Sequence, residues 1–299
     1  MTLATPLASL LGVQYALVQA PMANVQPPLL AAAVSNAGGL GSIAGVPLSA
    51  DALRAAIREV RAATSAPFGV NLFAPPYLNE SAFEVVLEER PAVFSFTFGP
   101  MDPTPLRESG ILVVGTATTA AEARALEVDI VVAQGAEAGG HRGTFLGSFE
   151  DGLVPLAELL PDVVAAVDVP VLAAGGIMDG ADAARALALG AQGVQLGTAF
   201  LFTPECEAPP EWLDALRRYD TVVTPAFSGR PGRAARTPFL EQLMNGPAPL
   251  PYPEQRAVVE ARQDAERFFL GGTGARRARE LPVAELVQTL VAGTEAATA

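Results

Sequence analysis

A glycine-rich segment near the middle of the chain carries the only histidine of the sequence. It runs from Gln134 to Gly143 and reads QGAEAGGHRG, with His141 as its eighth residue. Histidine is the usual general base near neutral pH. A lone histidine is more often structural or merely exposed, but this density of glycine frees the backbone to fold close against a ligand. We therefore predict that His141 is a catalytic base. Arg142 could pair with a bound anion or with Glu137, and we expect a structural pair with Glu137.

Two glycine turns further along the chain could hold a phosphate. Gly175 and Gly176 lie in the sequence AAGGI, and Gly197 and Thr198 lie in the sequence QLGT. Glycines let backbone N–H groups approach an anion, and a threonine hydroxyl can donate a further hydrogen bond. Each turn by itself would be an ordinary tight turn. Because each follows one of the last two predicted strands, the two together favour a phosphate site.

Side-chain amides lie at two other apolar runs. Asn71 belongs to one run, and Gln134 ends another. Each amide offers a donor and an acceptor, as the edge of a heterocycle with N–H and C=O groups requires. An amide that merely caps a strand is the competing interpretation, and for either residue alone it is the simpler one.

Eight short apolar runs predict the strands that position these groups. They cover residues 16–20, 40–44, 68–73, 93–98, 111–115, 129–134, 169–174 and 193–197. Helices are predicted between most of them, at 29–35, 50–63, 82–89, 119–126, 153–167 and 180–189. Eight βα units in a row favour a closed (β/α)₈ barrel over an open sheet. Active sites of such barrels form at the C-terminal ends of the strands, where the His141 loop, the amides and the glycine turns are expected.

The rest of the chain predicts an appendage. We expect residues 1–202 to form the barrel, and residues 203–299 to form a mostly helical extension packed over it and partly lining the substrate pocket. The extension includes the segment 212–219, a strand-like segment at 221–223 and a proline-rich stretch at 246–253, and helical segments follow at 254–269 and 282–292.

Composition excludes several classes of function. All 19 basic residues are arginine, so lysine chemistry is excluded, including Schiff bases with substrate or pyridoxal phosphate and a Walker-A phosphate site. A net charge of −13 argues against general nucleic-acid binding and polybasic membrane binding. One cysteine and one histidine exclude an internal disulfide and a cysteine-rich or multi-histidine metal site.

The N-terminal region has no targeting pattern. The first charged residue is Asp51, so no basic segment precedes an apolar run, and prolines interrupt the apolar runs before it. We expect a cytoplasmic protein without a membrane span.

The segment from Gln134 to Gly143 resembles the signature of nitronate monooxygenases, formerly called 2-nitropropane dioxygenases. It is most similar to the class I enzymes of bacteria and fungi. Other segments agree: QAPM at 19–22, PFGVNLF at 67–73, SFTFG at 95–99, AAGGI at 173–177 and QLGTAFL at 195–201. SGRPGR at 228–233 and PYPEQ at 251–255 match weaker patterns. The resemblance covers nearly the whole chain. The segment at 74–93 is shorter than usual, and LGGT at 270–273 stands where relatives often have AGQG.

The resemblance implies an FMN-dependent TIM barrel without a metal, with a homodimer as one compatible assembly. The implied flavin contacts are Met22 through its backbone, Asn71, Gln134, Gly139, Gly175, Gly176, Gln195, Leu196, Gly197 and Thr198. His141 would be the catalytic base and would contact substrate, and Tyr252 would line the substrate pocket. The implied reaction oxidises an alkyl nitronate, such as propionate 3-nitronate, with O₂ to a carbonyl compound and nitrite. A nitroalkane would first lose its α-proton to His141, so its oxidation should accelerate as rising pH deprotonates the imidazolium.

Three rival functions remain. An FMN-dependent NAD(P)H oxidoreductase, of the enoyl-acyl-carrier-protein reductase or quinone reductase kind, shares this barrel but needs a nicotinamide site that the sequence does not reveal. Barrels like inosine monophosphate dehydrogenase use a loop cysteine, whereas Cys206 follows the eighth predicted strand. A non-enzymatic flavin-binding role would leave the His141 loop without a purpose.

Overall fold

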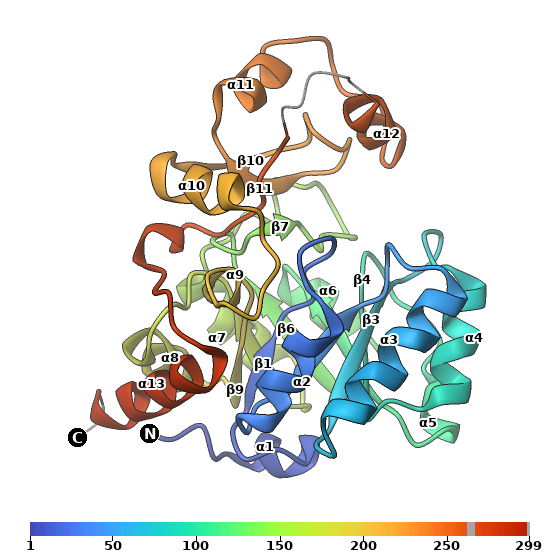
Figure 1. Ribbon diagram of the computed structural model, residues 1–299, viewed down its shortest axis with the longest axis vertical. Helices are drawn as coiled ribbons and strands as arrows, with labels where there is room; N and C mark the ends of the chain where they lie inside the picture. Colours follow the sequence, from blue (N-terminus) through green and yellow to red (C-terminus); the bar gives the residue numbers. More distant parts are fainter. Residues whose placement is uncertain (262–266, 298–299) are drawn as a thin grey trace.

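The eight predicted strands form one closed parallel barrel in the computed structural model, which describes residues 1–261 and 267–297 (Figure 1). The strands are β1 (Leu17–Gln19), β2 (Gly41–Ala44), β3 (Phe68–Phe73), β4 (Val93–Thr97), β5 (Leu112–Ala117), β6 (Ile130–Gln134), β8 (Val171–Ala174) and β9 (Gly193–Leu196). Their order is β1-β9-β8-β6-β5-β4-β3-β2, and all seven pairings are parallel. A parallel bridge between Val18 and Leu40 joins β2 back to β1 and closes the ring. The predicted (β/α)₈ fold class is confirmed.

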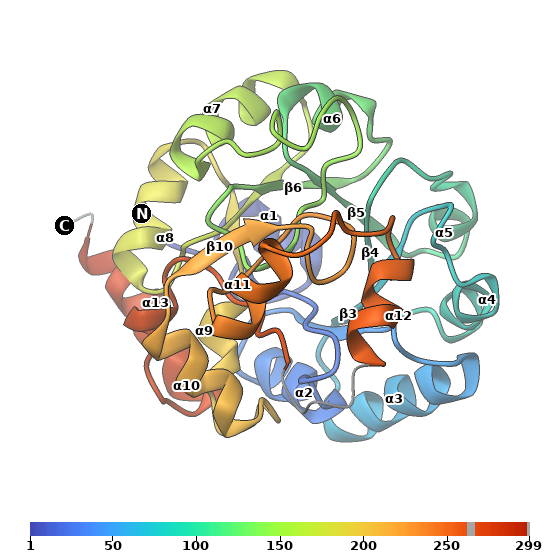
Figure 2. The same cartoon turned by 90° about the horizontal axis from the view of Figure 1, so that it is seen from above.

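Helices surround the barrel as the sequence predicts, with small shifts at their ends (Figure 2). They are α2 (Pro28–Asn36), α3 (Ala50–Ala63), α4 (Glu80–Glu89), α5 (Thr104–Glu108), α6 (Ala120–Ala125), α7 (Leu156–Ala166) and α8 (Gly180–Ala188). Side-chain caps define several starts, because the Ser49 hydroxyl accepts from the Ala52 amide and Asp179 forms a capping box with Asp182. The short gap between β4 and β5 holds only the five-residue helix α5.

The barrel is packed on the inside as well as the outside. A short helix that the sequence analysis did not predict, α1 (Pro6–Leu11), closes the N-terminal end of the barrel with Leu7 and Leu11. These side chains pack against inward-facing strand residues such as Val18, Val132 and Leu172. The lower half of the barrel is therefore solid core, which leaves the C-terminal end for a site.

The last helix, α13 (Val283–Ala296), completes the outer ring of helices. It lies against both α8 and α2, the place where a helix following the eighth barrel strand would otherwise pack. Gly180 of α8 and Gly293 of α13 touch, and a Cβ on Gly180 would lie 2.3 Å from the Gly293 carbonyl carbon. The extension predicted for residues 203–299 thus has two parts, a cap over the barrel and a helix in its wall. The domain division at residue 202 stays a prediction.

The cap consists of short elements above the C-terminal ends of the strands (Figures 1 and 2). They are α10 (Pro210–Arg218), β10 (Thr221–Thr224), β11 (Gly232–Ala235), α11 (Pro238–Met244), α12 (Glu254–Glu260) and a 3₁₀ turn at Ala275–Arg277. The short helix α9 (Thr198–Leu201) precedes the extension and directly follows β9. The helix predicted at 254–269 ends at Glu260; residues 262–266 of that prediction lie outside the described residues, and 267–269 are not helical. Within the part of the chain that the structure describes, no helix has the length and apolar character needed to cross a bilayer.

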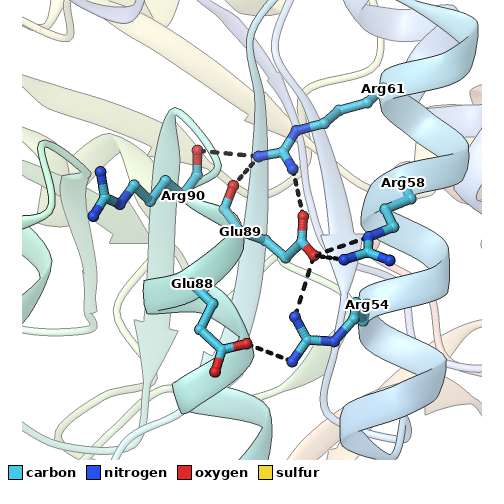
Figure 3. A network of polar contacts seen from close by, with 6 residues as sticks. All are labelled: Arg54, Arg58, Arg61, Glu88, Glu89 and Arg90. Atoms are coloured by element: carbon cyan, nitrogen blue, oxygen red, sulfur yellow. Dashed lines mark hydrogen bonds and ion pairs between the residues drawn. The ribbon is translucent and has the colours of Figure 1, made fainter.

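A charge cluster joins α3 to the end of α4 (Figure 3). The Glu89 carboxylate, whose side chain is 9% exposed, binds Arg58 at 2.8 Å and Arg54 at 3.2 Å and also pairs with Arg61. Burial by itself would raise the pKa of Glu89, but the hydrogen bonds from Arg58 and Arg54 outweigh it and hold the pKa below its ordinary value. Glu89 therefore places one negative charge among three arginines and reduces the repulsion between them.

Glu89→Gln should lower the free energy of unfolding by about 1–2 kcal/mol, because it leaves three arginines without their shared carboxylate. Glu88→Gln is the matched control, since Glu88 is 60% exposed and pairs only with Arg54; its effect should stay within about 0.5 kcal/mol. Urea denaturation at pH 7 measures both. The difference between the two variants should vanish as the pH falls through the lowered pKa of Glu89. Equal effects at pH 7 would contradict this account of the cluster.

Candidate active site

A cavity of about 220 Å³ opens at the C-terminal ends of the barrel strands, beneath the cap. Its lining includes His141 and every residue predicted to bind the cofactor: Met22, Asn71, Gln134, Gly139, Gly175, Gly176, Gln195, Leu196, Gly197 and Thr198. Tyr252 does not line the cavity, but its ring centre lies 5.6 Å from that of His141. The fold thus brings together residues that lie far apart in the sequence.

Glycine backbone forms one wall of the cavity. Gly175 and Gly176 have φ angles of 123° and 70°, which strain any residue with a side chain. Gly139 packs directly on the tail segment Gly271–Gly272, and a Cβ on Gly139 would lie 2.6 Å from the Gly272 nitrogen. The Gly272 amide donates to the Thr198 hydroxyl at 2.9 Å. This tail segment completes the wall, and the sequence analysis did not assign it to the site.

Several polar groups at the strand ends form hydrogen bonds to other residues of the cavity wall. The Asn71 amide nitrogen donates to the Ser95 carbonyl and hydroxyl at 3.0 and 3.1 Å. Gln134 donates to the His141 carbonyl at 3.1 Å and accepts from the Gly143 amide at 2.8 Å, so it anchors the histidine loop. The Met22 amide donates to the Gln26 side chain at 2.9 Å, so this lining residue's backbone N–H is already used within the protein.

A short strand holds the histidine in place. β7 (Gly140–His141) pairs antiparallel with β11 of the cap, with His141 opposite Gly232, and the Arg142 amide donates to the Pro231 carbonyl at 2.8 Å. The imidazole Nε2 lies 2.8 Å from the Ser228 hydroxyl. The ring is surrounded by Phe98, Phe227 and Tyr252, with centroid separations of 5.4–6.2 Å. The structure therefore fixes His141 from the cap side as well as the barrel side.

Arg142 has a structural role, as expected, but with different partners. Its fully buried guanidinium donates to the backbone carbonyls of Gly135, Gln134 and Gly152 at 2.7–2.9 Å. Glu137 instead accepts from the Leu156 amide at 3.0 Å, and no ion pair joins it to Arg142 among the described residues. The predicted pair with Glu137 is therefore wrong. Three backbone carbonyls at the base of the histidine loop accept the hydrogen bonds of Arg142 instead.

Two arginines make the surroundings of His141 positive. Arg230 is buried, stacks over the Phe98 ring at 3.7 Å, and donates to the carbonyls of Arg142 and Thr144. Arg256 of α12 hydrogen bonds to the Tyr252 hydroxyl and pairs with the half-exposed Glu260 at 2.7 Å. Burial, reinforced by the charges of Arg256 and Arg230, lowers the pKa of His141 to about 3. The imidazole is thus neutral at ordinary pH, in a site that attracts anions.

Comparisons with known proteins identify the family. A profile of the nitronate monooxygenase family matches residues 4–84 and 78–293. A nitronate monooxygenase of Pseudomonas aeruginosa is 42% identical, over 94% of this chain and 97% of the relative. One of Paraburkholderia phytofirmans is 39% identical, over 95% of this chain and 93% of the relative. The chain belongs to the nitronate monooxygenase family. It is accordingly a flavin-dependent oxidoreductase.

Solved structures place this nitronate monooxygenase family member among related barrels. A nitroalkane oxidase from Streptomyces ansochromogenes superposes with a TM-score of 0.89 and 39% identity, over 97% of this chain and 99% of that one. FabK from Thermotoga maritima gives a TM-score of 0.81 and 33% identity, over 98% and 97% of the two chains. Across residues 1–261 and 267–297, no three histidine, cysteine, aspartate or glutamate side chains are grouped to hold a metal ion.

The depressed pKa of His141 can be measured directly, because the chain has a single histidine. Its imidazole NMR signals should show no titration midpoint between pH 5 and 8 in the folded protein, since the neutral ring is favoured down to about pH 3. With an ordinary histidine, the rate of nitroalkane oxidation would rise with pH at about 6.5. In this site the rise should instead occur near pH 3, where His141 loses its proton. Because the unfolded histidine binds a proton near pH 6.5, His141 should also cost the folded state stability as the pH falls below about 6. A midpoint near 6.5 in the folded protein would contradict the site's electrostatics.

Proposed function

We propose that the protein oxidises alkyl nitronates, such as propionate 3-nitronate, with O₂ and FMN, giving a carbonyl compound and nitrite. The observation that carries this proposal is the position of His141 in the cavity lining, beside the Phe98 ring on which the Arg230 guanidinium stacks. A nitronate is an anion and suits such a pocket. A base with a pKa near 3 removes a carbon-bound proton slowly, so a preformed nitronate should be the better substrate than its neutral nitroalkane.

The cavity suits an FMN. The glycine turns at Gly175–Gly176 and at Gly197–Thr198 would hold the phosphate through backbone amides and the threonine hydroxyl. Asn71 and the Met22 carbonyl would meet the polar edge of the flavin ring, with Gln134 keeping the histidine loop beside it. Bound flavin supplies electron transfer from the nitronate to O₂. A homodimer and a cytoplasmic location stay predictions.

The protein's own residues would bind and orient the substrate. Arg256 and Arg230 would attract the negative nitronate, and the aromatic rings of Tyr252 and Phe98 would keep water away from it. With a nitroalkane, His141 would take the α-proton, and the resulting imidazolium would lie beside the nitronate it has formed. That ion pair raises the histidine pKa at the moment of transfer and offsets part of the unfavourable starting value.

An FMN-dependent NAD(P)H oxidoreductase is the second candidate. The observation that favours it is the similarity to FabK at 33% identity over nearly the whole chain. The nitroalkane oxidase similarity is higher in both identity and TM-score, which favours the nitronate reaction.

The purified protein should be yellow, and acid precipitation should release FMN. Gly176→Ala should weaken flavin binding about tenfold, because a Cβ there lies 3.2 Å from the Glu137 side chain and displaces the turn at the cavity wall. Gly110→Ala is the matched control, since Gly110 has a similar φ of 74° but lies outside the cavity with no atom within 4 Å of its Cβ. Flavin per protein and its dissociation constant are measured. FAD in the supernatant, or equal flavin loss in both variants, would overturn the cofactor assignment.

His141→Ala should keep the fold and the flavin but lower kcat/KM on a nitroalkane about 100-fold, because general-base catalysis is lost. Activity on the preformed nitronate should fall less than about 10-fold, since no carbon-bound proton remains to be removed. Oxygen uptake and nitrite release follow both substrates. Equal losses on the two forms would show that His141 only binds the anion, and absence of nitrite from either form in the wild type would sink the proposed function.

Arg256→Gln should raise KM for the anionic nitronate about fivefold, since it removes one attracting charge worth roughly 1 kcal/mol. KM for the neutral nitroalkane should change little. Arg236→Gln is the control, because Arg236 also pairs with a glutamate in the cap, at 2.9 Å from Glu241. If both substrates respond alike to Arg256→Gln, the charge does not select the anion.

A further inference from the structure

We propose that Ser228 is a positioning residue that fixes His141 as the Nε2–H tautomer and so leaves Nδ1 as the nitrogen that accepts the substrate proton. The assignment of the tautomer stands on hydrogen-bond geometry alone. Its catalytic consequence rests on the proposed function.

The Ser228 hydroxyl has three neighbours and a single proton. Its oxygen lies 3.0 Å from the Arg230 carbonyl, 3.3 Å from the Arg230 amide and 2.8 Å from the His141 Nε2. Because a carbonyl can only accept, the contact with the Arg230 carbonyl is a hydrogen bond only if the hydroxyl donates, and we therefore place the hydroxyl proton there. The hydroxyl oxygen then acts as an acceptor toward its other two neighbours. His141 must therefore donate, and the donor is Nε2–H.

A neutral imidazole carries one N–H, so a proton on Nε2 leaves the lone pair on Nδ1. No hydrogen bond to Nδ1 is found among the residues that the structure describes. Rotation of the ring is opposed by Phe227 and Tyr252, whose ring centres lie 5.4 and 5.6 Å from that of the imidazole. The basic nitrogen is thus selected by a residue that need not touch the substrate.

Backbone contacts hold Ser228 in this place. It is fully buried in a turn in which the Ser228 and Gly229 amides donate to the Pro225 carbonyl at 3.1 and 2.7 Å. Gly229 has a φ of 86°, and a Cβ there would lie 2.3 Å from the Leu250 carbonyl oxygen. The next strand, β11, pairs with the histidine strand β7. The distance between the serine and histidine side chains is therefore set by the turn and the strand pairing.

The single histidine makes the tautomer measurable in the intact holoprotein. Protein labelled with ¹⁵N-histidine, with no affinity-tag histidines, gives two ring nitrogen signals. The expected wild-type spectrum shows a protonated Nε2 with slow exchange and an unprotonated Nδ1. Ser228→Ala should give a mixture of tautomers and faster exchange, whereas Ser228→Thr, which keeps the hydroxyl, should preserve the wild-type pattern. Ser109→Ala is the control, because it also removes a hydroxyl bound to a backbone carbonyl, at the C-cap of the outer helix α5.

Kinetic measurements distinguish a role of Ser228 in positioning His141 from a role in stabilising the fold alone. Ser228→Ala should lower kcat on a nitroalkane about 10-fold with KM nearly unchanged, and should affect the preformed nitronate less. A wild-type Nδ1–H tautomer would overturn the proposal, whatever the activity and whether or not Ser228→Ala folds. An unchanged Nε2–H signal in folded Ser228→Ala would overturn it as well. If the tautomer responds as expected but the wild type oxidises neither substrate, this assignment stands and the proposed function fails.

Discussion

The pairing of β7 with β11 is the interaction on which the site depends. β7 is only two residues long, and the histidine loop on either side of it is rich in glycine, so the loop has little structure of its own. Pairing with the cap strand gives it a register, and the fully buried guanidinium of Arg142 ties its base to three carbonyls. Arg230, which follows the Ser228 turn, adds hydrogen bonds to two loop carbonyls. The cap is therefore part of the candidate site and not an independent cover.

The same arrangement determines the electrostatics. Arg142 and Arg230 hold the loop through backbone carbonyls, and Arg230, together with Arg256 of the cap, adds positive charge near the buried ring of His141. A neutral histidine is the consequence, because protonation would add a further cation to a desolvated site. A substrate that arrives as an anion, as in the proposed nitronate reaction, would suit this arrangement. This preference follows from how the loop is held, and it unites the structural role of the arginines with the nitronate reaction.

The sequence was sufficient to place those site residues that lie on the barrel strands or in the turns directly after them. Buried parallel strands appear as continuous apolar runs, and strand order in a barrel follows chain order, so the ends of β3, β6, β8 and β9 converge without knowledge of side-chain contacts. That is why Asn71, Gln134 and the two glycine turns could be placed in one cavity. Contacts between the cap and the barrel could not be predicted, since they join segments far apart in the sequence, 87 residues for Ser228 and His141 and 74 for Gly272 and Thr198, with no periodic pattern. Ser228 and Gly272 belong to that class. The Arg142 partners were missed because carbonyls are present at every residue and leave no signal in a sequence.

Anaerobic rapid mixing of the flavin-loaded protein with propionate 3-nitronate, and separately with NADH, tests the central claim most directly. The flavin spectrum reports electron transfer without interference from O₂. The proposed nitronate oxidation predicts fast reduction by the nitronate and slow or no reduction by NADH, for which the sequence reveals no nicotinamide site. Fast bleaching by NADH, with no spectral change on adding the nitronate, would contradict the account and make the protein an NADH-dependent reductase.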